Sequence, residues 1–198
     1  MWSLDAISSQ PFVFRNVWGS AASGAWIGGD ERVDGQTYAT SMHAGVFRRA
    51  VGDTSFAAVA LPYDPAELGP RWGALATLYT AGMSGDGSAW IVGKSVSSRP
   101  GYWRATSADG VTFTWSHMDR PSLDKSFSAV WGTGPNDTWA AGAYGRLRHW
   151  DGTDWLQAGV MPAKTPVTND LYAMWAAGPH DLWVVGDDLV LHHASNGP

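Results

Sequence analysis

The stretch from Phe127 to Gln157 reads FSAVWGTGPNDTWAAGAYGRLRHWDGTDWLQ, and its pattern decides the fold class. Apolar and aromatic residues gather at 127–131, 138–143 and 145–150 and begin again at Trp155, which is typical of short strands. The residues between them are rich in Gly, Pro, Asn and Asp, which favour turns because they adopt positive φ, fix φ or bond to their own backbone. The stretch therefore predicts four short antiparallel strands, a to d in chain order.

The same pattern recurs along the whole chain. Each copy has an aromatic residue in strand a and a tryptophan in strand b. These pairs are Trp18 with Trp26, Tyr79 with Trp90, Trp131 with Trp139, and Trp175 with Trp183. Strand c repeats as Gly-x-apolar-Arg in three copies, ending in Arg48, Arg104 and Arg148, and His192 takes that place in the fourth copy.

Four-stranded units with one aromatic signature each, about 40–50 residues long, are typical of propeller blades. The sequence therefore predicts an all-β fold, a four-bladed β-propeller forming a single domain over residues 1–198. The expected blades cover approximately residues 14–60, 75–118, 127–160, and 171–198 together with 1–8.

The two ends of the chain match each other. The sequence ends Asn196-Gly197-Pro198 where strand d of the last blade should begin, and it starts Met1-Trp2. Joined end to start, these residues resemble Asp151-Gly-Thr-Asp-Trp155. We predict a monomeric ring that the N-terminal strand closes by completing the last blade, which hides two sheet edges. The alternative is a strand-exchanged dimer, an eight-bladed ring in which each chain lends its terminal strand to the other.

Composition excludes several classes of function. The net charge is −5 with 13 scattered Lys and Arg residues, which argues against nucleic acid as a partner. No apolar run approaches the length of a membrane span. The absence of cysteine excludes disulfides and thiolate metal sites. No secretion signal follows Met1, so the compartment stays open, with a secreted or cell-surface location slightly favoured.

One turn carries a family resemblance. Ser107-Ala-Asp109-Gly110-Val-Thr112-Phe113 resembles the Asp-box, or BNR repeat, whose pattern is Ser-x-Asp-x-Gly-x-Thr-Trp, although it is one residue shorter and ends in Phe. In that family the box is a structural c–d hairpin opposite the ligand face. The repeat as a whole is similar to tryptophan-rich propeller repeats of large secreted bacterial proteins. The resemblance implies a propeller and no particular activity.

The charged residues of strand c favour a structural role. Arg48, Arg104 and Arg148 recur once per blade, which indicates contacts between blades rather than the arginine cluster of a sialidase. The histidines His149, His192 and His193 also fall on c strands, and we expect them to be structural.

The insertions indicate where a ligand binds. Because successive strands alternate in direction, the a–b and c–d turns lie on one face of a propeller, and the b–c and d–a connections lie on the other. All long connections belong to the second group, and they are residues 29–44, 61–73, 94–100, 116–126 and 159–170. Loops on a rigid scaffold commonly carry function. We therefore expect the ligand face there, mainly over the first two blades.

The favoured function is a binding module for a carbohydrate or other small molecule, without a cofactor. Aromatic residues beside charged ones hold sugar rings and small planar ligands. The candidate ligand-binding residues on the inserted face are Asp30, Tyr38, Tyr63, Asp64, Arg71, Trp72, Arg99 and Tyr144.

The alternative is a small enzyme, a lyase, isomerase or hydrolase, with one acid–base site on the same face. His43 and His117 border the inserted loops, and His117 with Asp119, or His43 with Asp30 or Glu31, would make a pair suited to general acid–base catalysis. No His-x-x-x-His or His-Glu-x-x-His spacing is present, so no metal site is predicted.

Overall fold

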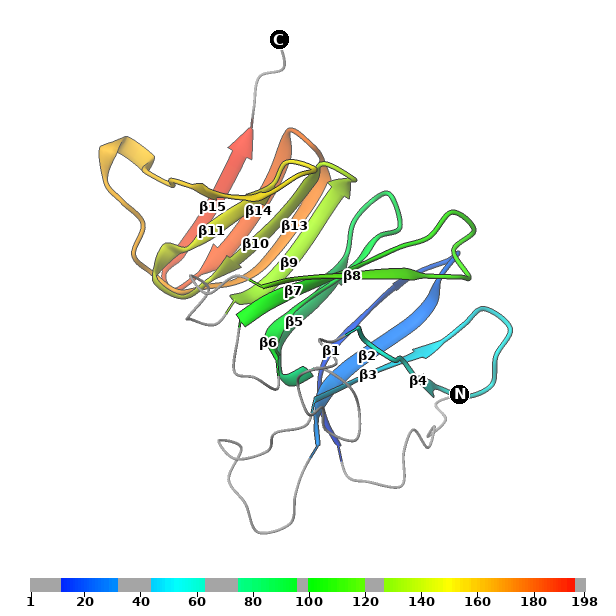
Figure 1. The fold of residues 1–198 in the computed structure, drawn as a ribbon. Coiled ribbons are helices and arrows are strands. Elements are labelled where there is room, and N and C mark those ends of the chain that lie inside the picture. Colours follow the sequence, from blue (N-terminus) through cyan, green and yellow to red (C-terminus); the bar gives the residue numbers. More distant parts are fainter. Residues whose placement is uncertain (1–11, 32–43, 63–74, 96–99, 120–126, 195–198) are drawn as a thin grey trace, which may run out of the picture.

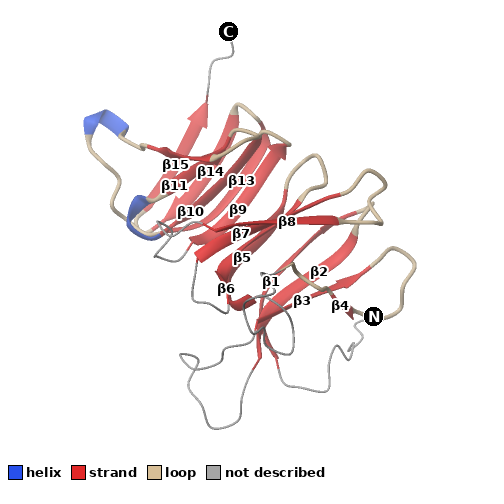
Figure 2. Ribbon diagram, viewed as in Figure 1, coloured by secondary structure: helices blue, strands red, loops and turns tan. Residues whose placement is uncertain are grey.

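The computed structural model describes residues 12–31, 44–62, 75–95, 100–119 and 127–194 (Figure 1). These residues form four antiparallel sheets and two single-turn 3-10 helices, with no α-helix among them (Figure 2). The predicted all-β class and the four blades are therefore confirmed.

Each sheet follows chain order from its first strand outward. Blade 1 consists of β1 (Phe12–Ser20), β2 (Gly24–Glu31), β3 (Ala44–Arg49) and β4 (Ala57–Ala58). Blade 2 consists of β5 (Leu75–Met83), β6 (Ala89–Ser95), β7 (Pro100–Thr106) and β8 (Thr114–Asp119). Blade 3 consists of β9 (Phe127–Gly134), β10 (Asp137–Gly142), β11 (Leu147–Trp150) and β12 (Trp155–Ala158), with η1 (Ala143–Gly145) before β11 and η2 (Pro162–Lys164) after β12. Blade 4 consists of β13 (Leu171–Gly178), β14 (Asp181–Gly186) and β15 (Leu189–Ala194).

The blades follow one another in chain order along an arc. The first strands of neighbouring blades pack together, β1 on β5, β5 on β9, and β9 on β13. Figure 1 shows the series running from blade 1 in blue to blade 4 in orange and red. Among the described residues, β1 and β13 do not pack extensively on each other, although a closed four-bladed ring would bring them together. The predicted closing strand, residues 1–8, lies outside the described residues.

The recurring tryptophans of strand b fill the wedges between blades. Trp26 is 1% exposed, and its ring lies 5.0 Å from Phe113 and 6.1 Å from Trp115 of blade 2. Trp90 is fully buried, and its ring lies 5.3 Å from Trp150 and 5.2 Å from Trp155 of blade 3. Large flat side chains suit such wedges because they bury much apolar area in edge-to-face contacts.

Arginines clamp blades 1 to 2 and 2 to 3, as expected. Arg48 donates to the carbonyl oxygens of Ser23 (2.8 Å), Gly110 (2.8 Å) and Val111 (2.5 Å), the last two in the c–d hairpin of blade 2. Arg104 donates to the carbonyl oxygen of Pro135 in blade 3 at 3.3 Å. Each guanidinium also stacks on the tryptophan of its own blade, at 5.1 Å from the ring centre.

The prediction that Arg148 is the third member of this series is wrong. The residue opposite the strand-b tryptophan is Arg48 in blade 1 and Arg104 in blade 2, but in blade 3 His149 lies opposite Trp139. The physical reason is η1, which takes up Gly145 and lets β11 begin only at Leu147. The repeat is therefore displaced by one residue.

In blade 3, histidine and aspartate replace the arginine contacts of blades 1 and 2. The His149 ring lies 4.2 Å from that of Trp139, and its Nε2 atom lies 2.9 Å from Asp137 Oδ1. The same carboxylate oxygen accepts a hydrogen bond from the Trp139 indole at 2.8 Å. The expected structural role of His149 is confirmed.

The same set recurs in blade 4. The His192 ring stacks on Trp183 at 3.9 Å, and its Nε2 atom lies 2.7 Å from Asp181 Oδ1. The Asp181 carboxylate also accepts the Trp183 indole N–H at 2.8 Å. His192 therefore has the expected structural contacts as well, although this face of blade 4 is exposed.

The hairpin that resembles an Asp-box has the expected hydrogen bonds. Asp109 Oδ1 accepts the backbone N–H groups of Val111 and Thr112, both at 2.8 Å, and the hydroxyl of Ser107 at 2.9 Å. These donors, with that of Thr112 the strongest, hold the pKa of Asp109 well below its ordinary value. Asp109 thus stabilises its own turn.

Asp109→Asn should lower the melting temperature at pH 7, because a neutral amide accepts these hydrogen bonds more weakly than a carboxylate. The folded-state pKa is depressed, so the contribution is complete above the unfolded value of about 4 and is lost as the pH falls toward the folded value. The difference in melting temperature between the two proteins should therefore shrink steadily below pH 4. Asp53→Asn, in the hairpin of blade 1, serves as the control. A difference that stays constant from pH 7 to pH 2.5 would contradict this role.

The described strand ends that flank the long connections all lie on one face of the arc, which we call the loop face. The strands that flank residues 32–43, 59–74, 96–99, 120–126 and 159–170 all end or begin there. The bounds differ slightly from those predicted. In particular, β8 continues to Asp119, so His117 lies in a strand rather than in the connection.

Candidate functional site

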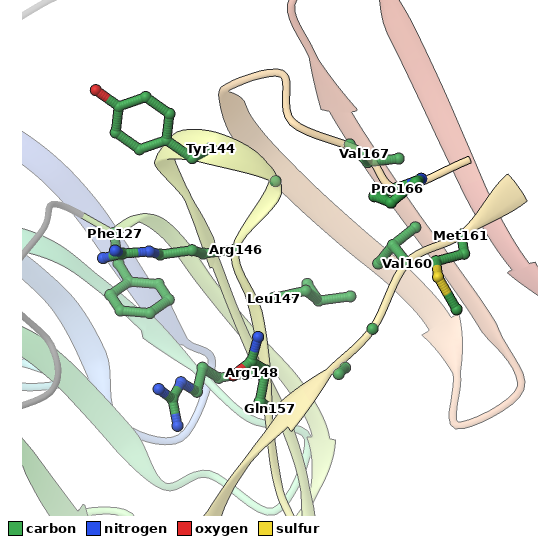
Figure 3. Close-up of a pocket in the computed structure, with 13 residues that line it drawn as sticks. Phe127, Tyr144, Arg146, Leu147, Arg148, Gln157, Val160, Met161, Pro166 and Val167 are labelled. Carbon is green, nitrogen blue, oxygen red and sulfur yellow. The ribbon is translucent and has the colours of Figure 1, made fainter. Parts of the chain in front are cut away.

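Blade 3 carries a hollow of about 440 Å³ at the loop face (Figure 3). We call it the blade-3 hollow. It is formed by η1, the start of β11, the end of β12 and the connection that leads to β13. Its described lining includes Phe127, Tyr144, Gly145, Arg146, Leu147, Arg148, Gln157, Ala158, Gly159, Val160, Met161, Pro166 and Val167.

The rim of this hollow depends on an unusual backbone at η1. Tyr144 and Gly145 have φ values of 59° and 67°, in the left-handed region. A Cβ atom at Gly145 would lie 2.0 Å from the Val167 carbonyl oxygen, so only glycine fits. The backbone N–H of Tyr144 donates to Asp170 Oδ1 at 2.8 Å, and that of Gly145 donates to the Asn169 carbonyl at 2.8 Å. These bonds fix the turn and leave the Tyr144 side chain 63% exposed.

The charged side chains that line the described part of the blade-3 hollow are arginines. Arg146 and Arg148 are the charged side chains among its described lining residues, and no carboxylate is found there. Figure 3 shows both arginines on the Phe127 side of β11, whereas Leu147 between them points toward Val160. This alternation follows from the pleat of a strand. The hollow can therefore hold a negatively charged group beside an apolar floor.

A second hollow of about 460 Å³ lies against the first strands of blades 1 to 3, and we call it the inner hollow. It is lined by Arg15, Asn16, Asp30, Thr77, Leu78, Tyr79, Phe127 and Ser128. Asn16 and Thr77 lie on β1 and β5, the first strands of their blades. Phe127 lines both hollows, so the two adjoin across the start of β9.

Some polar groups of the inner hollow form hydrogen bonds within the protein, and one buried oxygen does not among the described residues. Asp30 is 7% exposed. Its carboxylate accepts hydrogen bonds from Arg15 Nε at 2.7 Å and from the backbone N–H of Leu78 at 3.3 Å. The Asn16 Oδ1 atom is buried and has no hydrogen-bond partner among the described residues. Burial also raises the pKa of Tyr79, so its hydroxyl stays protonated near neutral pH.

Two of the predicted ligand-binding residues lie in these hollows. Tyr144 lines the blade-3 hollow and Asp30 lines the inner hollow. The contacts of Asp30 join blade 1 to blade 2, so its carboxylate has a structural task there. The other predicted residues, Tyr38, Tyr63, Asp64, Arg71, Trp72 and Arg99, lie outside the described residues, and their roles stay predictions.

The predicted acid–base residues do not meet in the described part of the structure. His117 lies on β8 opposite Trp103, and the two rings stack at 4.4 Å. Its Nε2 atom is buried. Neither His117 nor Asp119 lines one of the two hollows. His43 lies outside the described residues, so catalysis by His43, or by His117 with Asp119, stays a prediction.

Sequence reasoning missed Arg146 and misplaced Arg148. The signal was present, because the two arginines alternate with Leu147 at the start of a strand. The Gly-x-apolar-Arg repeat groups Arg148 with Arg48 and Arg104, and this grouping does not reveal its position at the blade-3 hollow. Gln157, Met161 and Val167 gave no signal, since only the folding of three separate segments brings them together.

The described residues contain no group of three or more His, Asp or Glu side chains arranged to hold a metal ion. None of the helices in the described ranges is long and apolar enough to span a membrane.

Comparison with known proteins adds information on the fold. No family model matches the sequence, and no curated protein matches it. One similar solved structure is YCF48 bound to a D1 peptide, with a TM-score of 0.58, 17% identity, and coverage of 93% of this chain and 52% of that chain. Another is YCF48 from Cyanidioschyzon merolae, with a TM-score of 0.62, 13% identity and the same coverages of 93% and 52%. This chain therefore spans about half the length of the structures it matches, and it has a β-propeller fold similar to that of YCF48.

Proposed function

We propose that this chain is a non-catalytic recognition module that binds an extended, negatively charged peptide across its loop face. The observation that carries the proposal is the lining of the blade-3 hollow. A chain with a net charge of −5 places Arg146 and Arg148 there, beside the exposed Tyr144, with no carboxylate among the described lining residues.

An extended ligand fits because the two hollows adjoin at Phe127. A peptide that places a carboxylate between Arg146 and Arg148 continues over Phe127 toward Asn16 and Arg15. The buried Asn16 Oδ1 atom offers an acceptor for a backbone N–H of that peptide. YCF48, whose fold is similar, has been solved with a peptide of D1, which supports a peptide as the class of ligand.

The same residues favour this ligand over the alternatives. A neutral carbohydrate uses aromatic platforms such as Tyr144, but it gives Arg146 and Arg148 no charge to pair with. An enzyme with an acid–base histidine requires that residue in the site, and no histidine is among the described residues of either hollow.

The test uses a fluorescein-labelled acidic decapeptide of Asp, Ser and Gly, and the same peptide with Asn in place of Asp. Fluorescence anisotropy should detect binding of the acidic peptide and at least tenfold weaker binding of the neutral one. Arg146→Ala and Arg148→Ala should each raise the Kd about tenfold, because a hydrogen bond to a charged group contributes about 1.5 kcal/mol or more. Binding should also weaken with added salt.

Arg49→Ala is the matched control, since Arg49 ends β3 at the face opposite the loop face and lines neither hollow. It should leave the Kd unchanged. Equal affinity for the two peptides, or no binding of the acidic one, would refute an anionic peptide ligand. Binding of neutral oligosaccharides that Arg146→Ala does not weaken would instead support the carbohydrate interpretation.

A further inference from the structure

In the described part of the chain, blade 4 has three strands, whereas each of the other blades has four. In blades 2 and 3 the fourth strand carries a tryptophan that packs on the preceding blade. Trp115 of β8 lies 6.1 Å from Trp26, and Trp155 of β12 lies 5.2 Å from Trp90. In blade 4, no strand of the described residues pairs with the outer edge of β15. The backbone groups along that edge are therefore available to another extended segment.

An apolar hollow marks the place of the missing side chain. This edge hollow has a volume of about 440 Å³ and lies between blade 3 and blade 4, next to β15. Its lining includes Trp139, Val160, Met161, Leu182, Leu191 and His193. Trp139 is the counterpart of Trp26 and Trp90, which both receive a tryptophan from the next blade. A strand added to β15 would place an aromatic side chain there in the same way.

The outer face of blade 4 carries exposed apolar side chains around the His192–Asp181 pair. Trp175, Trp183, Val185 and Val190 are 53%, 39%, 42% and 63% exposed. The residues equivalent to Trp183 in blades 1 and 2 are at most 1% exposed, because a following blade covers them. An exposed apolar patch of this kind is typical of an interaction surface. Blade 4 thus presents the surface that packs on a next blade elsewhere in the chain.

The opposite end of the arc offers a complementary surface. The face of blade 1 that no other blade of the described residues covers includes Phe14 and Val17, which are 40% and 78% exposed. In blades 2 and 3, the corresponding face packs on the preceding blade. The two ends of the arc therefore present the two halves of one repeated blade-to-blade interface, and a blade 1 fits on a blade 4.

Residues 1–8 carry the sequence of a fourth strand, with Trp2 in the place of Trp155. Residues 9–11 link this segment to β1, and a linker of that length spans at most about 15 Å. Along the arc, blade 1 is three sheet-to-sheet spacings of about 10 Å from blade 4. If residues 1–8 pair with β15, the short linker therefore requires the β1 of the same chain to pack against that blade 4. In the arc, this is the β1 of a second copy.

We propose that two copies of this chain form a closed eight-bladed ring. Residues 1–8 of each copy complete blade 4 of the other, Trp2 fills the edge hollow against Trp139, and blade 1 of each copy covers the exposed Trp175 and Trp183 of the other. The two interfaces are identical and related by a twofold axis, so the assembly closes without free ends.

Cysteine cross-linking tests the proposal, because the natural chain contains no cysteine. In blade 3, His149 pairs with Leu156 and Trp150 pairs with Trp155. The equivalent register sets Ser3 opposite His192, and directly opposed residues on neighbouring strands are close enough for a disulfide. Chains with Ser3→Cys and chains with His192→Cys, differently tagged and co-expressed, should form a disulfide-linked pair at twice the 21.2 kDa of one chain. Ser3→Cys with Val51→Cys should form none.

The double variant Ser3→Cys/His192→Cys distinguishes an eight-bladed ring of two chains from a four-bladed ring of one chain. A disulfide within one chain, with the mass of a monomer, would show a closed four-bladed ring and overturn the proposal. A monomeric mass by light scattering together with no disulfide would overturn it as well. Trp183→Asp should convert the dimer to a monomer with an unchanged circular dichroism spectrum, because Trp183 is 39% exposed and belongs to no buried core of the described residues. A Trp183→Asp variant that stays dimeric would also contradict the proposal. None of these outcomes depends on peptide binding.

Discussion

Replacing Trp90 by alanine should lower the free energy of unfolding by about 3–5 kcal/mol. Trp90 is fully buried between blades 2 and 3, where its ring contacts Trp150 and Trp155 and lies beneath the Arg104 guanidinium. Truncation removes the apolar contact and leaves a cavity between three separate strands. These strands cannot easily shift together to fill the cavity. Urea denaturation followed by tryptophan fluorescence and circular dichroism at one protein concentration measures the change.

Two further variants provide losses of stability with which that of Trp90→Ala can be compared. Trp90→Phe keeps part of the ring contact and should cost distinctly less than Trp90→Ala. Leu156→Ala removes a side chain that is 50% exposed on β12 and should cost less than about 1 kcal/mol. If Trp90→Ala cost no more than Leu156→Ala, the strand-b tryptophans would not hold the blades together.

Arg48→Ala should lower the free energy of unfolding by about 2–3 kcal/mol. The change removes charge-assisted hydrogen bonds to three carbonyl groups, two of which belong to the next blade, and a cation–π contact with Phe113 at 4.7 Å. Arg48→Lys should recover only part of the loss, because one ammonium group cannot reach all three carbonyls in the planar arrangement of a guanidinium.

The neighbouring residue supplies the control. Arg49→Ala removes the same charge from the same strand, and Arg49 stacks on the half-buried Phe56 of its own blade at 5.5 Å. It should cost less than about 1 kcal/mol. Equal losses in the two variants would show that Arg48 acts only through its charge and does not clamp the hairpin of blade 2.

The four blades were predictable because each repeat carries its own physical signature. A tryptophan in strand b fills the wedge toward the next blade, and the sequence repeats it at Trp26, Trp90, Trp139 and Trp183. The hairpin at Asp109 was predictable for a similar reason, since its short polar side chains bond the backbone within a few residues. Contacts between residues that are close together in the sequence leave a recognisable pattern in that part of the sequence.

The register of blade 3 was not predictable in the same way. The spacing of Gly145 and Arg148 matches that of Gly45 and Arg48. However, η1 delays the start of β11, so that His149 rather than Arg148 lies opposite Trp139. That delay depends on the left-handed backbone of Tyr144 and on its bond to Asp170, a residue far along the chain. A repeat alone does not reveal such a contact.

The candidate site was predicted only in outline. Strand alternation predicted that the long connections share one face, and Tyr144 and Asp30 line the two hollows. The hollows themselves arise where Phe127, the 144–148 segment and the 157–161 segment converge, and no motif marks that convergence. The role of Asp30 shows the same limit, because the sequence does not reveal that Arg15 and the Leu78 N–H occupy its carboxylate.

Backbone amide shifts measured by NMR during titration with the acidic decapeptide test the central claim, that the loop face around Phe127 is the binding surface. We expect the largest shifts at residues 144–148, 157–160 and 127–128, with smaller ones at the inner hollow. Arg146→Ala should reduce them throughout. Shifts confined to the outer face of blade 4 or to the c–d hairpins around Asp109 and Asp151, with residues 144–148 unaffected, would contradict it.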